Sequence, residues 1–225
     1  MRFVPLLPCS LDPGPWRGLG PVALRWDGDP GPRWEAEALR GLVIHAIHLP
    51  GVARVQEGLE ALRRRPLVPD FLVIPVARPA GREAGFRLLG DLEALLEATA
   101  GRGVKLALRL EPGAAAPVLE LLRQAHGEAV GFCWHPGAED LEALADRLWT
   151  GDCGPGADLR PLQRLGYRWD MALPAADPAA FRAQAAALEA AHPGVIFPAE
   201  LPATALGRPV VPDPDVALGK HWDRP

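Results

Sequence analysis

Short apolar runs alternate with segments of helical periodicity along almost the whole chain of 225 residues. Each run has the length of one strand, and each helical segment is long enough to carry the chain back for a parallel neighbour. The runs predict strands at 3–7, 22–26, 42–48, 71–77, 105–110, 130–134, 168–173 and 195–200. This alternation indicates a parallel sheet with helices packed outside it.

Apolar residues at spacings of three and four predict helices between these strands. In the segment 87–100, Leu88, Leu92 and Leu95 share one face. The predicted helices lie at 34–39, 52–65, 87–100, 116–125, 140–148 and 178–191, with a shorter turn at 158–165. The first connection, 10–21, is too rich in proline and glycine for a normal helix.

Eight strand–helix repeats in roughly 200 residues predict a compact (β/α)8 barrel of the TIM type with a shortened first helix. We expect the barrel to span residues 1–201. A proline-rich arm without helical period follows over residues 202–225. Its Trp222 is a candidate for covering the barrel mouth or for anchoring a homodimer.

The chain contains very few small polar residues. The chain has no asparagine, one serine, and two lysines against twenty-two arginines. Serine-nucleophile chemistry therefore has one candidate and Schiff-base chemistry two, and the lack of asparagine suits a heat-tolerant source. A formal net charge of −4 gives no basic footprint for nucleic acid, so a nuclease is disfavoured.

Cysteine spacing and hydropathy indicate a cytoplasmic chain. Cys9, Cys133 and Cys153 have no Cys-x-x-Cys spacing, which indicates neither a disulfide framework nor a zinc knuckle. The N-terminal apolar run is too short for a signal peptide, and no stretch approaches the roughly eighteen apolar residues of a membrane span. We therefore expect no contact with a membrane.

Strand alternation sorts the side chains by face. In the run 105–111 the large apolar residues alternate, which leaves Arg109 and Glu111 on the inward face. His48 is placed inward because it ends its strand, although the pattern there is ambiguous. The same sorting brings further polar residues to the strand ends: Arg25, Asp27, Arg78, His135, Asp170 and Glu200. The carboxyl ends of TIM-barrel strands form one face, where active sites are built, so we expect the site there.

Three stretches resemble strand ends of the xylose-isomerase-like barrels, the sugar phosphate isomerase/epimerase group. They are GVKLALRLEPG at 103–113, VGFCWHPG at 130–137 and GVIFPAEL at 194–201, and they resemble the fifth, sixth and eighth strands of that family. The resemblance implies a TIM-type barrel that binds a divalent ion through a Glu, an Asp, a His and a Glu. It also implies proton transfer beside a carbonyl or hydroxyl carbon.

The chain departs from this ligand set at most positions. Arg109 stands where the first Glu is expected, His135 stands where the Asp is expected, and the stretch 168–174 lacks the His. Only Glu200 matches. Because a guanidinium repels a divalent cation and hard ions need several oxygen ligands, we expect the usual metal site to be lost.

One interpretation is a site rebuilt without its metal, and hence without a cofactor. Arg109 would replace the ion and hold a substrate oxygen or carboxylate. Glu111, His135 or Glu200, the predicted catalytic residues, would exchange a proton. The alternative for the cofactor is a transition metal bound through the same three residues, since histidine is a frequent ligand for such ions.

Arg25, His48 and Asp170 join Arg109 as predicted substrate-binding residues. The expected ligand is a small hydroxylated or anionic carbon compound, and the expected reaction is an isomerisation or epimerisation. The other interpretation is a catalytically inactive barrel that binds a small ligand or a protein partner. Fold alone does not choose between the two.

Two further patterns have simpler explanations. The glycine-rich segment 150–159 precedes a short helix, as phosphate loops do, but it lacks their Lys-Ser/Thr ending and is expected to be a plain loop. His45 and His48 are expected to face opposite sides of their strand, so we do not expect them to act as a pair.

Overall fold

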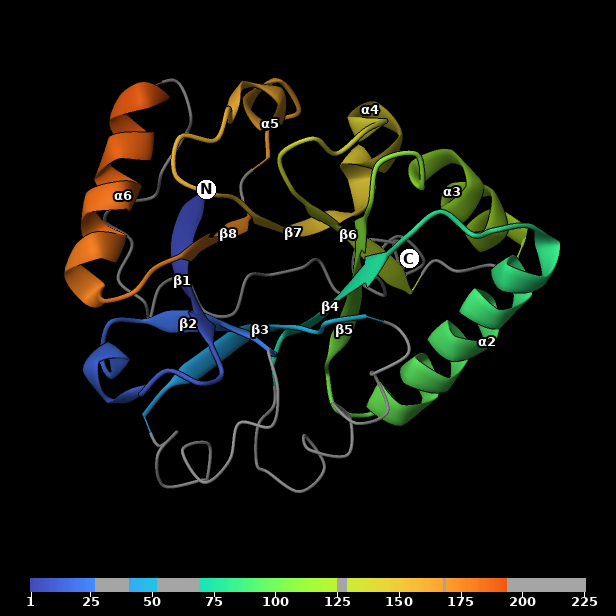
Figure 1. The fold of residues 1–225 in the computed structure, drawn as a ribbon, viewed down its shortest axis with the longest axis horizontal. Helices are drawn as coiled ribbons and strands as arrows, with labels where there is room; N and C mark the ends of the chain where they lie inside the picture. Colours follow the sequence, from blue (N-terminus) through green and yellow to red (C-terminus); the bar gives the residue numbers. More distant parts are fainter. Residues whose placement is uncertain (27–40, 52–68, 125–128, 168, 194–225) are drawn as a thin grey trace, which may run out of the picture.

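The computed structural model describes residues 1–26, 41–51, 69–124, 129–167 and 169–193. Eight parallel strands pair in sequence order, and the last strand pairs with the first to close a barrel (Figure 1). The strands are β1 (Arg2–Pro8), β2 (Pro21–Arg25), β3 (Val43–His48), β4 (Phe71–Val76), β5 (Lys105–Leu110), β6 (Val130–Trp134), β7 (Leu148–Asp152) and β8 (Asp170–Pro174). The predicted TIM-type barrel is confirmed.

Helices lie on the outside of the barrel, with α2 beside β5, α3 next to α2 and α6 next to β8 (Figure 1). The helices are η1 (Gly14–Trp16), α2 (Arg82–Thr99), α3 (Ala115–Gln124), α4 (Leu141–Leu144), η4 (Ala145–Arg147), α5 (Arg160–Arg164) and α6 (Pro178–Ala191). Among them, none is long and apolar enough to cross a membrane. The helices predicted at 34–39 and 52–65, and the arm 202–225, lie outside the described residues.

The first connection holds a single 3-10 turn, as its proline content predicts. The turn η1 places Trp16 in a fully buried position. Its ring packs edge-on against Phe181 of α6, with 6.2 Å between the ring centroids. One large aromatic side chain thus fills space that a longer first helix would otherwise cover.

The seventh strand differs from the prediction. The segment Leu148–Asp152 forms β7, whereas the sequence pattern indicated the end of a helix there followed by a loop. Leu148 continues the apolar spacing of the preceding helix, and Gly151 is a residue type common in turns. These two features mask the pattern of the five-residue strand that contains both residues. The strand predicted at 168–173 is consequently β8, and the one predicted at 195–200 lies outside the described residues.

The barrel wall separates two apolar cores. The inner core contains small residues such as Ala23, Ala107 and Ala172, because the lumen of an eight-stranded barrel is narrow. The outer core contains large residues such as Leu106 and Leu108, which pack against the helices. The inward and outward sorting predicted for β5 is therefore confirmed.

A bulge in β3 turns His45 into the barrel. The pairing of β2 with β3 shifts by one residue, so Ile44 belongs to the outer core and Ala46 to the inner one. His45 packs edge-on against Phe71 of the inner core, with 5.2 Å between the ring centroids. The expectation that His45 and His48 face opposite sides is wrong, because the bulge interrupts the alternation on which it rested.

A second register shift, between β6 and β7, turns Trp149 toward the inner core. Its ring centroid lies 6.4 Å from that of Phe71. The room for the indole comes from Gly131 on β6, because a Cβ at that position would overlap the indole ring. Gly131 is therefore required by packing.

We expect Gly131→Ala to destabilise the protein by about 1–3 kcal/mol, because the added methyl group must displace the partly buried indole of Trp149. Gly90→Ala is the matched control: Gly90 lies in α2 with open space around it, so alanine there should stabilise by up to about 1 kcal/mol. Urea unfolding of both variants measures the difference. A Gly131→Ala protein as stable as the parent would contradict this packing argument.

Candidate functional site

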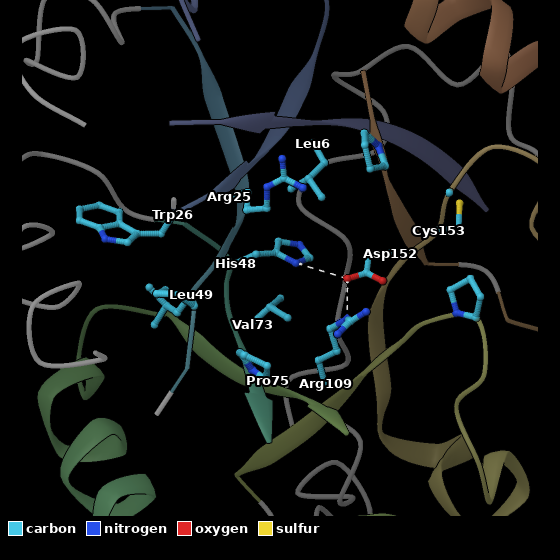
Figure 2. Close-up of a pocket in the computed structure, with 14 residues that line it drawn as sticks. Leu6, Arg25, Trp26, His48, Leu49, Val73, Pro75, Arg109, Asp152 and Cys153 are labelled. Atoms are coloured by element: carbon cyan, nitrogen blue, oxygen red, sulfur yellow. Dashed lines mark hydrogen bonds and ion pairs between the residues drawn. The ribbon is translucent and has the colours of Figure 1, made fainter. Parts of the chain in front are cut away.

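A cavity of about 720 Å³ opens at the carboxyl ends of the strands, the face where TIM barrels build their sites. Most of its lining is apolar, and four prolines belong to it: Pro50, Pro75, Pro136 and Pro174. The thiol of Cys153 also lines it, together with four other titratable side chains: Arg25, His48, Arg109 and Asp152 (Figure 2). They come from the ends of β2, β3, β5 and β7.

Asp152 is the carboxylate at the centre of this group (Figure 2). Nε of Arg109 donates to its Oδ2 at 3.0 Å, and Nδ1 of His48 lies 3.6 Å from the same oxygen. Burial raises the pKa of Asp152, and the positive charges of Arg109 and His135 partly oppose that shift. Arg109 is therefore the counter-ion of a carboxylate whose side chain is only 16% exposed.

The imidazole of His48 is neutral at neutral pH. Its pKa is lowered to about 3, first by burial and then by the neighbouring charges of His45, Arg109 and Arg25. Its Nε2 atom is buried and has no hydrogen-bond partner among the residues that the structure describes. A neutral imidazole has one donor and one acceptor nitrogen, so this ring can take a proton or accept a hydrogen bond from a ligand.

Arg25 gives the cavity an excess of positive charge. It ends β2 with an exposed side chain, and within the described part of the chain its guanidinium has no hydrogen bond or ion pair. Arg109 and Asp152 neutralise one another, and His48 is uncharged. The described lining therefore carries one net positive charge, which suits an anionic group.

The cavity brings together three of the predicted site residues, Arg25, His48 and Arg109. Glu111 is exposed and does not line it. His135 is buried with Nδ1 3.0 Å from the carbonyl oxygen of Pro136 and Nε2 2.6 Å from that of Leu110, so both ring nitrogens face the backbone. Glu200 and Asp27, also predicted at the mouth, lie outside the described residues.

Asp170 lies at the opposite end of the barrel from the cavity, and its predicted place in the mouth is corrected. It is the first residue of β8, not a late one, because the strand begins where Asp170 pairs with Arg2 of β1. Arg2 donates to both carboxylate oxygens of Asp170, and Nδ1 of His45 lies 3.4 Å from Oδ2. These groups form a polar contact at the amino end of the barrel.

Asp152 and the adjacent Cys153 line the cavity but are absent from the predicted site. The sequence does carry a signal for them. In LWTGDCG a short strand-like run ends in a polar residue with glycine two positions later, as in the LRLEPG and FCWHPG stretches at the ends of β5 and β6. The signal was obscured because the segment 150–159 resembles a loop.

Comparison with known proteins identifies the fold. No protein-family model matches the chain, and no curated protein matches it. A xylose isomerase domain protein from Planctomyces limnophilus is 14% identical and covers 86% of this chain and 95% of its own, with a TM-score of 0.62. The chain has the fold of a xylose-isomerase-like barrel.

Two other solved structures share this xylose-isomerase-like fold. A D-tagatose 3-epimerase-like protein is 13% identical, covers 84% of this chain and 96% of its own, and has a TM-score of 0.61. The IOLI protein, solved with a bound zinc atom, is 12% identical, covers 87% and 98%, and has a TM-score of 0.57. The likeness at these identities is one of fold.

The described residues of this xylose-isomerase-like barrel do not fit a divalent metal ion. They contain no group of three or more His, Cys, Asp or Glu side chains able to hold one. Asp152, the one carboxylate among the described lining residues, is engaged by the guanidinium of Arg109. Of the ligands considered for a transition metal, Glu111 is exposed and both ring nitrogens of His135 face carbonyl oxygens.

Acid sensitivity is an expected consequence of the buried neutral His48. Its folded-state pKa of about 3 lies below the ordinary value of 6.5, so the unfolded chain takes up the proton first. Stability is then lost as the pH falls from 6.5 toward 3, at most by about 2–3 kcal/mol at pH 4.5. His48→Gln removes this component, so the difference in unfolding free energy between about pH 7 and pH 4.5 shrinks.

The matched control is His192→Gln, because the partly buried His192 follows α6 and is not part of the cavity lining. Urea unfolding at both pH values gives the free energies. Equal acid sensitivity in His48→Gln and the parent protein would contradict a neutral, buried His48.

Proposed function

We propose that this barrel binds a small hydroxylated carbon compound bearing an anionic group and moves a proton on it, as isomerases and epimerases do. The observation that carries the proposal is the positively charged cavity at the carboxyl ends of the strands. Its position matches the face on which TIM barrels build active sites. The fold shared with a xylose isomerase domain protein and a D-tagatose 3-epimerase-like protein supports this reaction class.

Two arginines supply the anchor for the anionic group. Arg25 has all its guanidinium donors available within the described residues, and Arg109 uses its Nε on Asp152. The planar fork of a guanidinium matches carboxylate and phosphate oxygens in pairs, which favours these groups over neutral oxygens. The anionic group therefore binds at Arg25 and at the remaining donors of Arg109.

The volume and the walls of the cavity suit a small ligand. About 720 Å³ lies within the range of ordinary small-molecule sites, roughly 300–1,000 Å³. Its prolines have fixed backbone φ angles and present rigid apolar walls to the carbon chain of a ligand. The polar groups beside those walls set the orientation of the ligand.

Proton transfer beside a carbonyl group needs positive charge near the oxygen that becomes negative. In this site Arg109 supplies that charge, since its guanidinium is fixed to Asp152 and borders the same cavity. A metal ion is not required for this step. A barrel that binds its ligand without turning it over is the second candidate, and it differs from the first in a measurable way.

Thermal unfolding with a panel of compounds tests the ligand class. We expect sugar phosphates or 2-hydroxy acids to raise Tm, and neutral sugars of the same carbon skeletons to leave it unchanged. Arg25→Gln should weaken binding of an active compound at least tenfold, because one charged pair is lost. Arg87→Gln is the matched control, since Arg87 is an exposed arginine of α2 that pairs with Glu83.

The outcomes separate the candidates. A compound that raises Tm and is converted, as followed by NMR of the product mixture, supports the enzyme. A compound that binds through Arg25 without conversion supports the binding protein. Equal Tm shifts with neutral and anionic compounds would contradict the proposed binding of an anionic group by Arg25 and Arg109.

We also expect that neither the stability of the protein nor its ligand binding requires a metal ion. Chelation with EDTA should leave both Tm and the ligand-induced shift unchanged, because in this proposal Arg109 supplies the positive charge that a divalent ion would otherwise supply. Elemental analysis of the purified protein checks this. One equivalent of bound metal, lost together with ligand binding after chelation, would contradict the proposal.

A further inference from the structure

Within the described part of the chain, the buried Nε2 atom of His48 has no hydrogen-bond partner, whereas such an atom normally has one. More than nine-tenths of buried polar groups in proteins are hydrogen-bonded, and an orphaned one costs about 1–3 kcal/mol. His48 lines the cavity, so a bound ligand can supply the missing partner. This points to a role for the ring that the packing of the protein alone does not explain.

We infer that His48 accepts the proton of the reaction, that Asp152 fixes its tautomer, and that an anion bound at Arg25 and Arg109 makes the ring an effective base. This inference rests on the proposed function, because it assumes an anionic ligand in this cavity. It assigns three different tasks to the polar residues of one site: Arg25 and Arg109 bind, His48 moves the proton, and Asp152 positions.

The tautomer follows from the contact with Asp152. Nδ1 of His48 faces carboxylate oxygen Oδ2 at 3.6 Å, and a lone pair on Nδ1 would be repelled by that oxygen. The proton of the neutral ring therefore lies on Nδ1, which leaves the lone pair on Nε2. Arg109 holds the carboxylate in place through its 3.0 Å hydrogen bond, so Asp152 is a positioning residue (Figure 2).

The base strength of His48 depends on the charges that surround it. Arg25 on β2, His45 on the same strand and Arg109 on β5 oppose its protonation, and Asp152 on β7 lies beside its Nδ1. Without a ligand, burial and the first three groups hold its pKa at about 3. An anion at the two arginines cancels their charge and so removes two of the causes that lower this pKa, which makes the ring a stronger base than it is without the ligand.

The resulting step is a proton transfer in which all atoms and charges balance. The C–H bond beside the substrate's carbonyl carbon breaks, its proton forms an N–H bond at Nε2, and its electron pair stays on the substrate as an enediolate. Asp152 then lies beside the imidazolium, and Arg109 lies beside the enediolate oxygen. Return of the proton to the neighbouring carbon, with the hydroxyl proton passing between the two oxygens, completes an isomerisation with one base.

Nitrogen NMR of the full chain labelled at histidine tests each part. Without ligand, the His48 ring should be neutral from about pH 8 to pH 5, with its proton on Nδ1. Saturating inorganic phosphate or glycolate, as model anions, should raise its pKa by at least about one unit. Asp152→Asn should lower the population of the Nδ1–H tautomer, because an amide repels the lone pair less than a carboxylate does.

Arg25→Gln separates the charge effect from the ligand. In this variant the pKa of His48 should rise without any anion, and the response to phosphate should be lost or greatly reduced. Arg87→Gln should behave as the parent protein in both respects. Asn at position 152 keeps an oxygen for Arg109, so both test variants are expected to fold.

Calorimetry of phosphate and glycolate binding distinguishes a failure of the proposed anion site from a failure of the proposed role of His48. Binding that leaves the His48 ring unchanged overturns this inference while the proposed function stands. Failure of both anions to bind contradicts the proposed anion site and, with it, the proposed effect of a bound anion on the base strength of His48. A wild-type ring that carries its proton on Nε2, or a tautomer unaffected by Asp152→Asn, overturns the role of Asp152.

Discussion

The hydrogen-bonded ion pair between Arg109 and Asp152 is the contact on which the site depends. It joins the ends of β5 and β7 across the intervening strand β6, with 3.0 Å between Nε and Oδ2. It provides the counter-charge of a largely buried carboxylate, and that carboxylate faces His48. In the family that the sequence resembles, the position of Arg109 is expected to hold a metal-binding Glu. In this chain the same strand end carries the fixed positive charge of a guanidinium instead of a carboxylate.

The interior of the barrel explains why the polar groups meet at this end. Small inner-core residues and the indole of Trp149 fill the lumen below the cavity, and Gly131 gives the indole its room. At the amino end, Arg2 and Asp170 pair with each other. The described charged groups of the lumen are thus satisfied at one end, whereas Arg25 and Nε2 of His48 at the other end keep unused hydrogen-bonding capacity.

Alternation within one strand was sufficient to predict much of this arrangement. The large leucines of β5 identify its outer face, and that places Arg109 inside. Features that depend on two strands were not predictable in this way. The side on which His45 lies follows from a register shift against β2, and the place of Asp170 follows from pairing with β1. Asp152 was missed because a five-residue strand containing a glycine has too short a pattern to stand out from its loop.

A fixed guanidinium changes which group controls the pH behaviour of such a site. An arginine keeps its charge over the whole working range of a protein, so the anchor itself does not titrate. In the described lining, burial lowers the pKa of His48 and raises the pKa of Asp152. Burial thus favours the uncharged form of both, and the charge of Arg109 favours the carboxylate of Asp152 while opposing the imidazolium of His48. The same cation therefore holds the pair in the state of a negative positioning group beside a neutral base, and that state is the one from which a proton can be accepted.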